Sequence, residues 1–301
     1  MRFGFAIPQF FADGEFDPDG FGRFVRRVEE LGFHSGWTQE QSLGSMPCLG
    51  PLDTMTFAAA HTSTLRLGCA VFVTTLHNPV QLAKSLSTVD QLSKGRLDVG
   101  VGTGGRGRMF SAFGVERDRY VSTFTEGIEL LKALWTESPV DFDGEFWQLA
   151  GAGMEPKPLQ KPHPPLWFGG ASRPALRRAV RMGDGFIGAG STPTATFAQQ
   201  VDIVRAAHES QSGFPIAKRV YLALDDRPAR ARQRMNERLA EVYGRRVATI
   251  ESAAITGTAD ECTEALRAVG EAGAELVIIT PLFDQEYHLE KLAADVLPSL
   301  T

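Results

Sequence analysis

Along most of the chain, short apolar runs alternate with longer segments in which apolar residues recur every three to four positions. The short runs are typical of buried parallel strands, and the longer segments are typical of amphipathic helices. The pattern predicts eight strands, at residues 3–7, 34–38, 65–74, 96–101, 166–168, 184–187, 219–224 and 276–280. It predicts helices at residues 18–31, 52–61, 78–92, 121–135, 174–182, 194–209, 228–243, 259–272 and 285–297. Eight successive βα units favour an α/β fold, a single (β/α)8 TIM barrel over residues 1–301, rather than an open doubly wound sheet.

Two segments interrupt this alternation and are predicted to be insertions. The first, residues 138–165, comes after the helix that follows the fourth strand. Within it, Phe142-Asp-Gly-Glu-Phe146 predicts a β-hairpin with an Asp-Gly turn, and the prolines that follow favour an extended return. The second, between Gly244 and Gly257, lies between the seventh and eighth strands and has no assigned element.

Charge and cysteine content narrow the classes of function. The net charge is −5 and no basic stripe occurs, which argues against a nucleic-acid partner. The three cysteines, Cys48, Cys69 and Cys262, are far apart, which argues against disulfides and thiolate metal sites and fits a reducing cytoplasm. No His-x-His or His-Glu-x-x-His spacing indicates a metal site either. No apolar stretch approaches the roughly 20 residues that span a bilayer, so we expect a cytoplasmic protein without a membrane partner.

In such a barrel the active site lies at the carboxyl ends of the strands. No lysine ends a predicted strand there and no Gly-x-Ser-x-Gly motif occurs, which argues against Schiff-base and serine-nucleophile chemistry. Gly, Thr and Ser predominate, with the acid Glu40 and the amide Gln41, and this favours a large polar cofactor over unaided hydrolysis. Glu40 is either an acid or base beside that cofactor or a solvated loop residue. His77 precedes Asn78-Pro79, and a helix N-cap followed by Pro explains that tripeptide without a catalytic role.

Two glycine-rich segments follow predicted strands. Gly169-Gly170 precedes a helix that begins after Ser172, and free backbone N–H groups at a positive helix end suit a phosphate. A plain strand-to-helix turn with Ser172 as N-cap explains the same residues. Gly100-Val-Gly-Thr-Gly-Gly105 formally matches a dinucleotide fingerprint, but no evident helix follows and the acid expected about 20 residues on is absent. Close approach of a planar ring and a tight structural turn are the two remaining interpretations of this segment.

Several motifs occur in a fixed order between residues 1 and 192. They are residues 29–33 with Trp37, 65–71, 78–84, 90–97 with 100–103, 156–158 with 161–165, and 167–170 with 183–186. As a set they resemble the luciferase-like monooxygenase family, whose members are (β/α)8 flavin- and deazaflavin-dependent oxidoreductases. A length near 300 residues without long insertions is more similar to the branch that uses the deazaflavin coenzyme F420. The resemblance therefore implies coenzyme F420, with FMN as the alternative.

The resemblance also implies where the cofactor binds. Its ring is expected at the barrel mouth, beside a non-proline cis peptide in a bulge of the third strand near Ala70-Val71. Its phosphate is expected on the turn after the fifth strand and near residues 188–191, while Arg106, Arg108, Arg173 and Arg177 would meet the phosphate and the oligoglutamate tail of F420. The expected cofactor-binding residues are Ala70, Val71, Thr103, Gly104, Arg108, Gly169, Gly170, Ala171, Ser172, Gly190 and Ser191.

The chain departs from the family pattern after the second strand. The sugar-phosphate and alcohol dehydrogenases of the F420 branch have an Asp-His pair there, whose histidine accepts the alcohol proton. Here the corresponding residues are Glu40 and Gln41, and glutamine cannot accept that proton. Gly105 also replaces an acidic residue of that branch. Glu40 and Gln41 are the expected catalytic positions, with Glu40 as acid or base.

Three hypotheses of function follow. The first is hydride transfer between F420 and a small organic substrate. The second is an FMN-dependent two-component monooxygenase that needs oxygen and a separate reductase. The third is a catalytically silent flavin- or deazaflavin-binding protein. The resemblance implies a homodimer in each case, while the identity of the substrate is not specified by the sequence.

Overall fold

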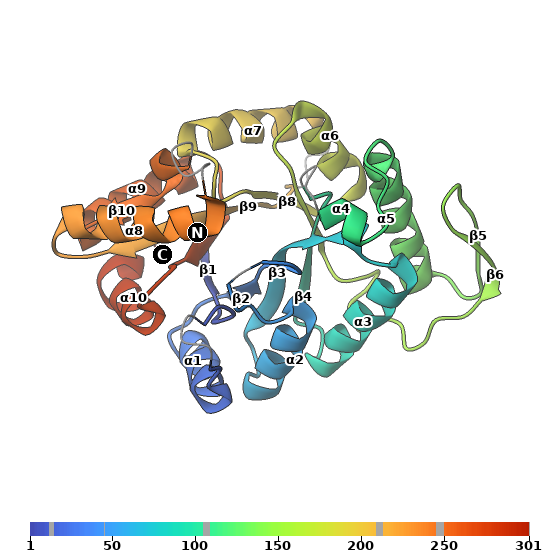
Figure 1. Ribbon diagram of the computed structural model, residues 1–301, viewed down its shortest axis with the longest axis horizontal. Helices are drawn as coiled ribbons and strands as arrows, with labels where there is room; N and C mark the ends of the chain where they lie inside the picture. The colour runs from blue at the N-terminus through green and yellow to red at the C-terminus, as the bar shows by residue number, and fades with distance from the viewer. Residues whose placement is uncertain (12–14, 45, 105–108, 209–212, 245–249, 301) are drawn as a thin grey trace. The chain divides into compact units, whose positions relative to one another are not determined.

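A computed structural model describes residues 1–300 except 12–14, 45, 105–108, 209–212 and 245–249, and Figure 1 shows its elements. The strands are β1 (Arg2–Ala6), β2 (Ser35–Thr38), β3 (Arg66–Val73), β4 (Leu97–Gly102), β5 (Val140–Asp143), β6 (Gln148–Ala152), β7 (Leu166–Gly169), β8 (Gly185–Gly188), β9 (Ile216–Leu224), β10 (Ile255–Gly257) and β11 (Leu276–Thr280). The α-helices are α1 (Pro18–Glu30), α2 (Pro51–His61), α3 (Pro79–Leu92), α4 (Met109–Ala112), α5 (Tyr120–Thr136), α6 (Arg173–Met182), α7 (Thr194–Ala207), α8 (Pro228–Tyr243), α9 (Ala259–Glu271) and α10 (Gln285–Lys291). Shorter helical turns are η1 (Thr74–Leu76), η3 (Glu251–Ala253), a π-helical turn (Leu292–Val296) and a final 3-10 turn (Leu297–Ser299).

The sheet confirms the predicted fold class. Its strand order is β10-β9-β11-β1-β2-β3-β4-β7-β8, and an additional β8–β9 pairing closes it. The eight strands that form the closed part coincide with the eight predicted ones, and helices connect them, so the fold is a (β/α)8 barrel. A barrel brings the carboxyl ends of its strands to one rim, which is where its functional residues are sought.

The described chain divides into two compact units. The first unit comprises Met1–Pro8, Asp19–Trp37 and Trp167–Thr301, and the second comprises Gln9–Pro18 and Thr38–Leu166. Each unit is described below by itself. The expectation of one domain over residues 1–301 stays a prediction.

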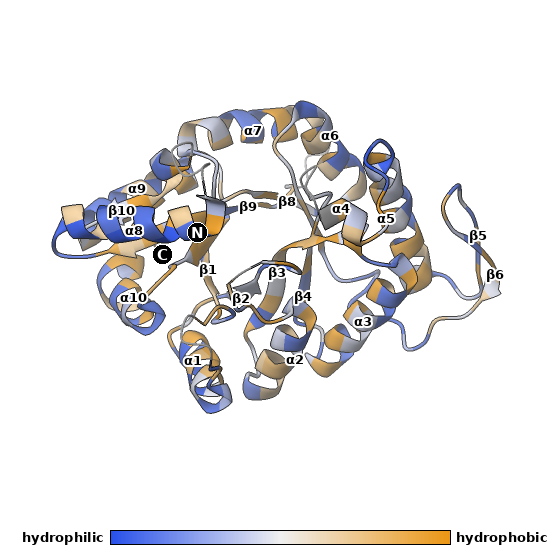
Figure 2. Cartoon of the chain, in the orientation of Figure 1, coloured by the Kyte–Doolittle hydropathy of each residue, from blue (hydrophilic) through white to orange (hydrophobic). Residues whose placement is uncertain are grey.

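Local sequence signals explain where the helices begin and end. In α1, Phe21, Phe24, Val25 and Val28 are buried at the spacing of one helix face, and the other face is polar, as the alternating colours in Figure 2 show. Gly32 follows at a φ of +79°, a conformation that favours glycine after a helix end. Further along the chain, the side chain of Asn78 accepts hydrogen bonds from the backbone of residues 80 and 81, which confirms the predicted N-cap of α3.

In the first unit, β1, β9 and β11 have two distinct faces. Phe5 packs against Phe24 of α1 with ring centroids 6.0 Å apart, so its face of the sheet is the helix face. Gly4 lies on the opposite face, here called the inner face, and is in register with Ile278, which is in turn in register with Arg219. A Cβ on Gly4 would lie 2.7 Å from the indole nitrogen of Trp37, so the inner face requires glycine there.

The second unit contains the first predicted insertion. Strands β5 and β6 form the predicted hairpin, and the turn spans residues 144–147, with the Gly144 N–H donating to the Trp147 carbonyl over 2.9 Å. The predicted hairpin is confirmed: Asp143 is the last residue of β5 and Gly144 opens the turn. The carboxylate of Glu126 accepts three backbone N–H groups of residues 145–147 and so stabilises this turn.

Three expectations need correction. The segment between Gly244 and Gly257, left unassigned from sequence, contains η3 and β10, and β10 pairs in parallel with Leu222–Leu224 at the end of β9. The short helix α4 was not predicted, because four residues carry no helical period. The last predicted helix ends as α10 at Lys291, and the chain continues as π-helical and 3-10 turns.

Candidate functional site

The carboxyl ends of β2 and β3 bring together a carboxylate and an imidazole. Glu40 follows β2, and His77 follows η1 at the end of β3. Glu40 Oε1 lies 2.6 Å from His77 Nε2, and Glu40 Oε2 accepts the Val73 N–H over 2.5 Å. The Glu40 side chain is 5% exposed, whereas that of His77 is 25% exposed. The carboxylate is therefore fully engaged inside the protein, and the imidazole is the partner that solvent and ligands can reach.

The hydrogen bonds of Glu40 determine the tautomer of His77. A carboxylate that accepts a backbone N–H on one oxygen also accepts on the other, so Nε2 carries the proton of a neutral imidazole. Nδ1 is then the acceptor nitrogen, and no partner is recorded for it among the described residues. A carboxylate that orients an imidazole in this way is the arrangement used for general acid–base chemistry. His77 is thus the candidate acid or base, and Glu40 is its positioning residue.

Sequence reasoning named Glu40 but assigned His77 a structural role, because Asn78 and Pro79 explained the local motif. The structural and the functional interpretation are compatible, since Asn78 caps α3 while the adjacent His77 imidazole contacts Glu40. A usable signal was that an acid and a histidine follow neighbouring strands. Gln41, the other expected catalytic residue, places its side-chain amide against Gly44 rather than in this pair.

A bulge in β3 lies directly before the Glu40–His77 pair. The Ala70-Val71 peptide is cis, as the family resemblance implied, and the register with β4 shifts between Cys69 and Phe72. Ala70 and Val71 are half-buried, while Cys69 and Phe72 on either side are buried. The bulge therefore presents a small apolar surface, here called the β3 shelf and formed by Ala70 and Val71.

Glycines in β4 make room for this bulge. A Cβ on Gly100 would lie 2.0 Å from the Cys69 carbonyl oxygen, and one on Gly102 would lie 2.8 Å from a methyl carbon of Val71. Gly104 has a φ of +67°, and a Cβ there would lie 2.5 Å from a methyl carbon of Val73. The glycine spacing that formally matched a dinucleotide fingerprint is thus explained by packing against β3.

Two threonines complete the described part of this region. Thr75 Oγ1 donates to the Thr103 carbonyl over 3.0 Å, which joins the end of β3 to the segment after β4. The hydroxyl oxygen of Thr74 is buried, and no hydrogen-bond partner is recorded for it among the described residues. A buried hydroxyl without a partner is a group that a bound polar ligand would satisfy. Five expected site residues of the second unit, Glu40, Ala70, Val71, Thr103 and Gly104, therefore lie in one connected region; Arg106 and Arg108 fall outside the described residues.

The first unit contains the expected phosphate turn. Ser172 N-caps α6, its hydroxyl accepting the Ala175 N–H over 3.4 Å, so the predicted cap is confirmed. Gly169 and Gly170 are half-buried and Ala171 is exposed. A Cβ on Gly170 would lie 2.8 Å from the Cβ of Ala175, so glycine lets the turn pack closely on the helix. The first turn of α6 contains no acidic residue, which leaves its positive end free to attract an anion.

A buried lysine lies beneath the turn that contains Gly190 and Ser191. Lys218 is 1% exposed, and its ammonium donates to the carbonyls of Ala189 (2.5 Å) and Arg219 (2.7 Å). Burial, with a smaller contribution from the charge of Arg219, lowers the pKa of Lys218 to about 7. Sequence reasoning missed this group because the predicted strand began one residue later, at Arg219. A long apolar run that includes a charged residue was the available signal.

Other chemistries have little support in the described part of the chain. No group of three or more His, Cys, Asp or Glu side chains there is arranged to hold a metal ion. Cys48, Cys69 and Cys262 form no disulfide, and burial raises the pKa of Cys48 to about 11. Burial also raises the pKa of Cys262 to about 12, with a smaller contribution from Glu261. Within the described ranges, the helices are too short or too polar to cross a membrane.

Comparisons with known proteins show the family of the chain. Residues 1–276 match a family model described as luciferase-like monooxygenase. An FMNH2-dependent dimethylsulfone monooxygenase from Pseudomonas putida is 32% identical over 167 residues, which are 54% of this chain and 46% of that protein. An F420-dependent glucose-6-phosphate dehydrogenase from Amycolatopsis mediterranei is 30% identical over 183 residues, 58% of this chain and 54% of that protein. The chain spans about half the length of these curated relatives.

A solved structure shows the same fold over the whole chain. The monooxygenase RslO1 from Streptomyces bottropensis superposes with a TM-score of 0.86 at 24% identity, covering 100% of each chain. At that identity the likeness concerns the fold, and the chemistry has to be argued from the residues themselves.

Proposed function

The chain belongs to the luciferase-like monooxygenase family, and from that premise we propose that it is an oxidoreductase that exchanges a hydride between coenzyme F420 and a small organic substrate. The observation that carries this proposal is the Glu40–His77 pair beside the β3 shelf. Hydride exchange with an alcohol or carbonyl needs a proton acceptor or donor next to a flat redox ring. A carboxylate-oriented imidazole beside an apolar surface supplies both requirements.

The residues present fit a flavin-type cofactor. The β3 shelf offers half-buried apolar atoms for a planar ring, and the Thr74 hydroxyl offers a buried polar group without a recorded partner among the described residues. The turn at Gly169–Ser172 offers backbone N–H groups at a helix end free of acids, which suits a phosphate. When bound, the cofactor supplies the two-electron chemistry. Ala70, Val71, Thr103 and Gly104 are proposed for the ring, and the residues at 169–172 with Gly190 and Ser191 are proposed for the phosphate.

His77 is the proposed proton-transfer residue. Its Nδ1 accepts the proton that a substrate hydroxyl loses on oxidation, or returns it on reduction, while Glu40 holds Nε2. The negative charge of Glu40 stabilises the imidazolium that forms. This arrangement replaces the role that the Asp-His pair has in the resembled dehydrogenases, and it removes the need for Gln41 to accept a proton.

Anaerobic titration tests the cofactor assignment. The full chain is mixed with F420 and, separately, with FMN, and binding is followed by absorbance and fluorescence. We expect F420 to bind in the micromolar range or tighter, and a substrate panel of alcohols, aldehydes and ketones to change its visible band. Binding of FMN alone would overturn the F420 assignment, and binding of F420 without turnover in the panel would favour the silent binding protein.

Ser172→Ala tests the phosphate turn with a matched pair of ligands. Loss of the N-cap hydroxyl is expected to weaken FMN binding several-fold and riboflavin binding much less, because riboflavin lacks the phosphate. Thr258→Ala, which removes the N-cap of α9, is the control and should leave the two ligands unchanged.

The FMN-dependent monooxygenase is the second candidate function. It is favoured by the 32% identity to the dimethylsulfone monooxygenase. This reaction needs a separate reductase to supply reduced FMN. Oxygen uptake that depends on reduced FMN and on an organic substrate would establish it, whereas F420-dependent turnover without oxygen would exclude it. For either candidate we propose a homodimer, which sedimentation equilibrium tests directly.

A further inference from the structure

Arg219 projects from the inner face of the sheet in the first unit. It is in register with Ile278, while Tyr221 is in register with Thr280, the last residue of β11. Because alternate residues of a strand share a face, Arg219, Tyr221 and Thr280 lie on the same side as Gly4, opposite to the face that packs against α1. Arg219 Nε donates to Thr280 Oγ1 over 3.2 Å, so its guanidinium lies at the carboxyl end of β11. That end of a barrel strand is where ligands bind.

The guanidinium of Arg219 has no acidic partner in the described part of the chain. Its recorded contacts are the Thr280 hydroxyl and the Tyr221 ring, whose centroid is 4.9 Å from the guanidinium carbon. Other arginines differ: Arg27, Arg66, Arg119, Arg230, Arg234, Arg238 and Arg267 each pair with a carboxylate. Arg219 is half-buried and its one recorded hydrogen bond uses Nε, so its guanidinium can meet an anion without first breaking an ion pair recorded among the described residues.

Two tyrosine hydroxyls lie near the Arg219 guanidinium and add hydrogen-bond donors to it. Tyr221 and Tyr243 of α8 are joined by a 2.5 Å hydrogen bond between their hydroxyls. Burial raises the pKa of Tyr243 above its ordinary range, and the nearby charge of Arg219 opposes that rise. The phenol is therefore neutral at physiological pH and keeps a proton to donate. Only one hydroxyl of the pair can donate to the other, which leaves the second O–H for a ligand.

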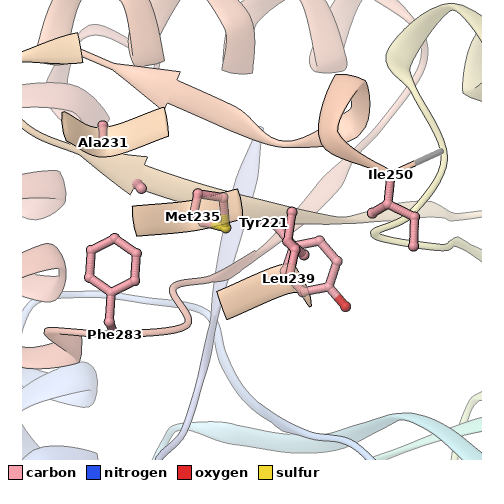
Figure 3. Packing of buried hydrophobic residues seen from close by; sticks show 7 residues of the cluster. Tyr221, Ala231, Met235, Leu239, Ile250 and Phe283 are labelled. Atoms are coloured by element: carbon pink, nitrogen blue, oxygen red, sulfur yellow. The ribbon is translucent and has the colours of Figure 1, made fainter. Parts of the chain in front are cut away.

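A hydrophobic cluster holds the tyrosines in place. Tyr221 belongs to a buried cluster that also contains Met235 and Leu239 of α8, Ile250, and Phe283 after β11, and Figure 3 shows the cluster. These contacts fix the ring on which the guanidinium rests. The donors are therefore preorganised, which reduces the entropy that binding costs.

We propose that Arg219, together with Thr280 and the Tyr221–Tyr243 pair, forms a carboxylate-binding subsite. The guanidinium of Arg219 is planar and presents two parallel N–H donors, which match the two oxygens of a carboxylate. The proposed subsite contains no acid among the described residues. The subsite rests on the proposed function, since it selects substrates that carry a carboxylate. The glutamate tail of F420 is a second source of the same chemistry.

Binding of small carboxylates to the full chain tests the subsite. Benzoate and acetate are titrated by calorimetry and ligand-observed NMR, with benzamide and acetamide as neutral counterparts. We expect the carboxylates to bind and the amides not to bind, and Arg219→Met to weaken benzoate binding about 10-fold or more. No benzoate binding, or equal binding by Arg219→Met, would overturn the proposal.

Matched variants control for folding. Arg234→Met removes another guanidinium that lies over a ring, 4.0 Å from the Phe283 centroid, but this one already pairs with Asp284. It should leave benzoate binding unchanged. If Arg219→Met does not fold, Thr280→Val and Tyr243→Phe replace it, and each is expected to weaken benzoate binding a few-fold; no effect of either would count against the subsite.

Competition identifies the source of the carboxylate. Benzoate that still binds in the presence of saturating F420 indicates a substrate carboxylate, whereas displacement by F420 but not by FMN indicates the glutamate tail. Both results support a carboxylate subsite. Because benzoate binding needs no cofactor, its failure leaves the cofactor proposal standing, and failure of F420 and FMN to bind leaves the benzoate result standing.

Discussion

The end of β3 in the second unit and residues 218–219 of β9 in the first unit differ in the charge of their hydrogen-bond partners. At β3, a buried carboxylate is balanced by an imidazole and a backbone N–H. At β9, Lys218 and Arg219 are cations whose recorded partners among the described residues are carbonyl and hydroxyl oxygens and aromatic rings. The first region pairs an acid with a base, while the recorded partners of the second include no acid among the described residues.

This difference suits the two regions to different chemical roles. A carboxylate that accepts from Nε2–H holds the imidazole in place in both protonation states, so a proton can be exchanged at Nδ1 without moving the ring. A half-buried guanidinium with neutral partners, such as that of Arg219, is instead stabilised by an anion that arrives from outside. The β3 region is therefore suited to proton transfer, and the β9 region is suited to holding an anionic ligand.

Replacement of His77 is the strongest way to break this comparison. His77→Ala should lower the single-turnover rate by about 10²–10⁴-fold, because the proton acceptor is lost, and added imidazole should restore part of it. Glu40→Gln should cause a smaller loss that imidazole does not restore, since Glu40 only positions the ring. Stopped-flow absorbance of the bound cofactor measures both.

His208→Gln is the control, since His208 belongs to the first unit, where it follows α7 and packs against Phe214. If the single-turnover rate of His77→Ala were unchanged, His77 would not be the proton-transfer residue.

Gly100→Ala tests whether the β3 region depends on its bulge. A Cβ at this position would lie 2.0 Å from the Cys69 carbonyl oxygen, so β3 or β4 must shift. We expect the free energy of unfolding to fall by about 3 kcal/mol or more. Gly153→Ala, where nothing lies within 4 Å of the new Cβ, should change it by less than about 0.5 kcal/mol. Urea denaturation measures both, and equal effects would show that the glycine is not required for packing.

Lys218→Met tests the β9 region through the pH dependence of the free energy of unfolding. The pKa of Lys218 is about 7 in the folded chain and 10.5 for an ordinary lysine, so between these values the unfolded chain binds more protons and stability rises with pH. The variant lacks this gain. Its free energy of unfolding relative to the parent should therefore fall between pH 7 and 10, by at most about 1.4 kcal/mol per pH unit.

Urea denaturation at several pH values between 7 and 10 measures this slope. Lys291→Met is the control, because the hydrogen bond to Asp295 raises the pKa of that exposed lysine and keeps it protonated throughout the range. Parallel stability curves for the parent and Lys218→Met would mean that the ammonium carries no buried charge.

The candidate site was only partly accessible from sequence. Glu40, the β3 shelf and the turn at Gly169–Ser172 were named, because strand ends and glycine-rich turns are local signals. His77 was set aside, because Asn78 gave a sufficient local explanation. Lys218 was set aside with the other lysines because it ends no predicted strand, and Arg219 was named only as the first residue of one. The chemistry of a strand residue depends on which face it occupies and on its neighbours across the sheet.

The sequence by itself determined the eight strands, the helices with their caps, and therefore the barrel, since period and capping are properties of neighbouring residues. Only the tertiary structure decided that Glu40 binds His77 across 37 positions, that Gly100 accommodates Cys69, and that Arg219 lacks an acid among the described residues. Those outcomes depend on the register between strands, which aligns residues distant in the chain and which no local pattern encodes.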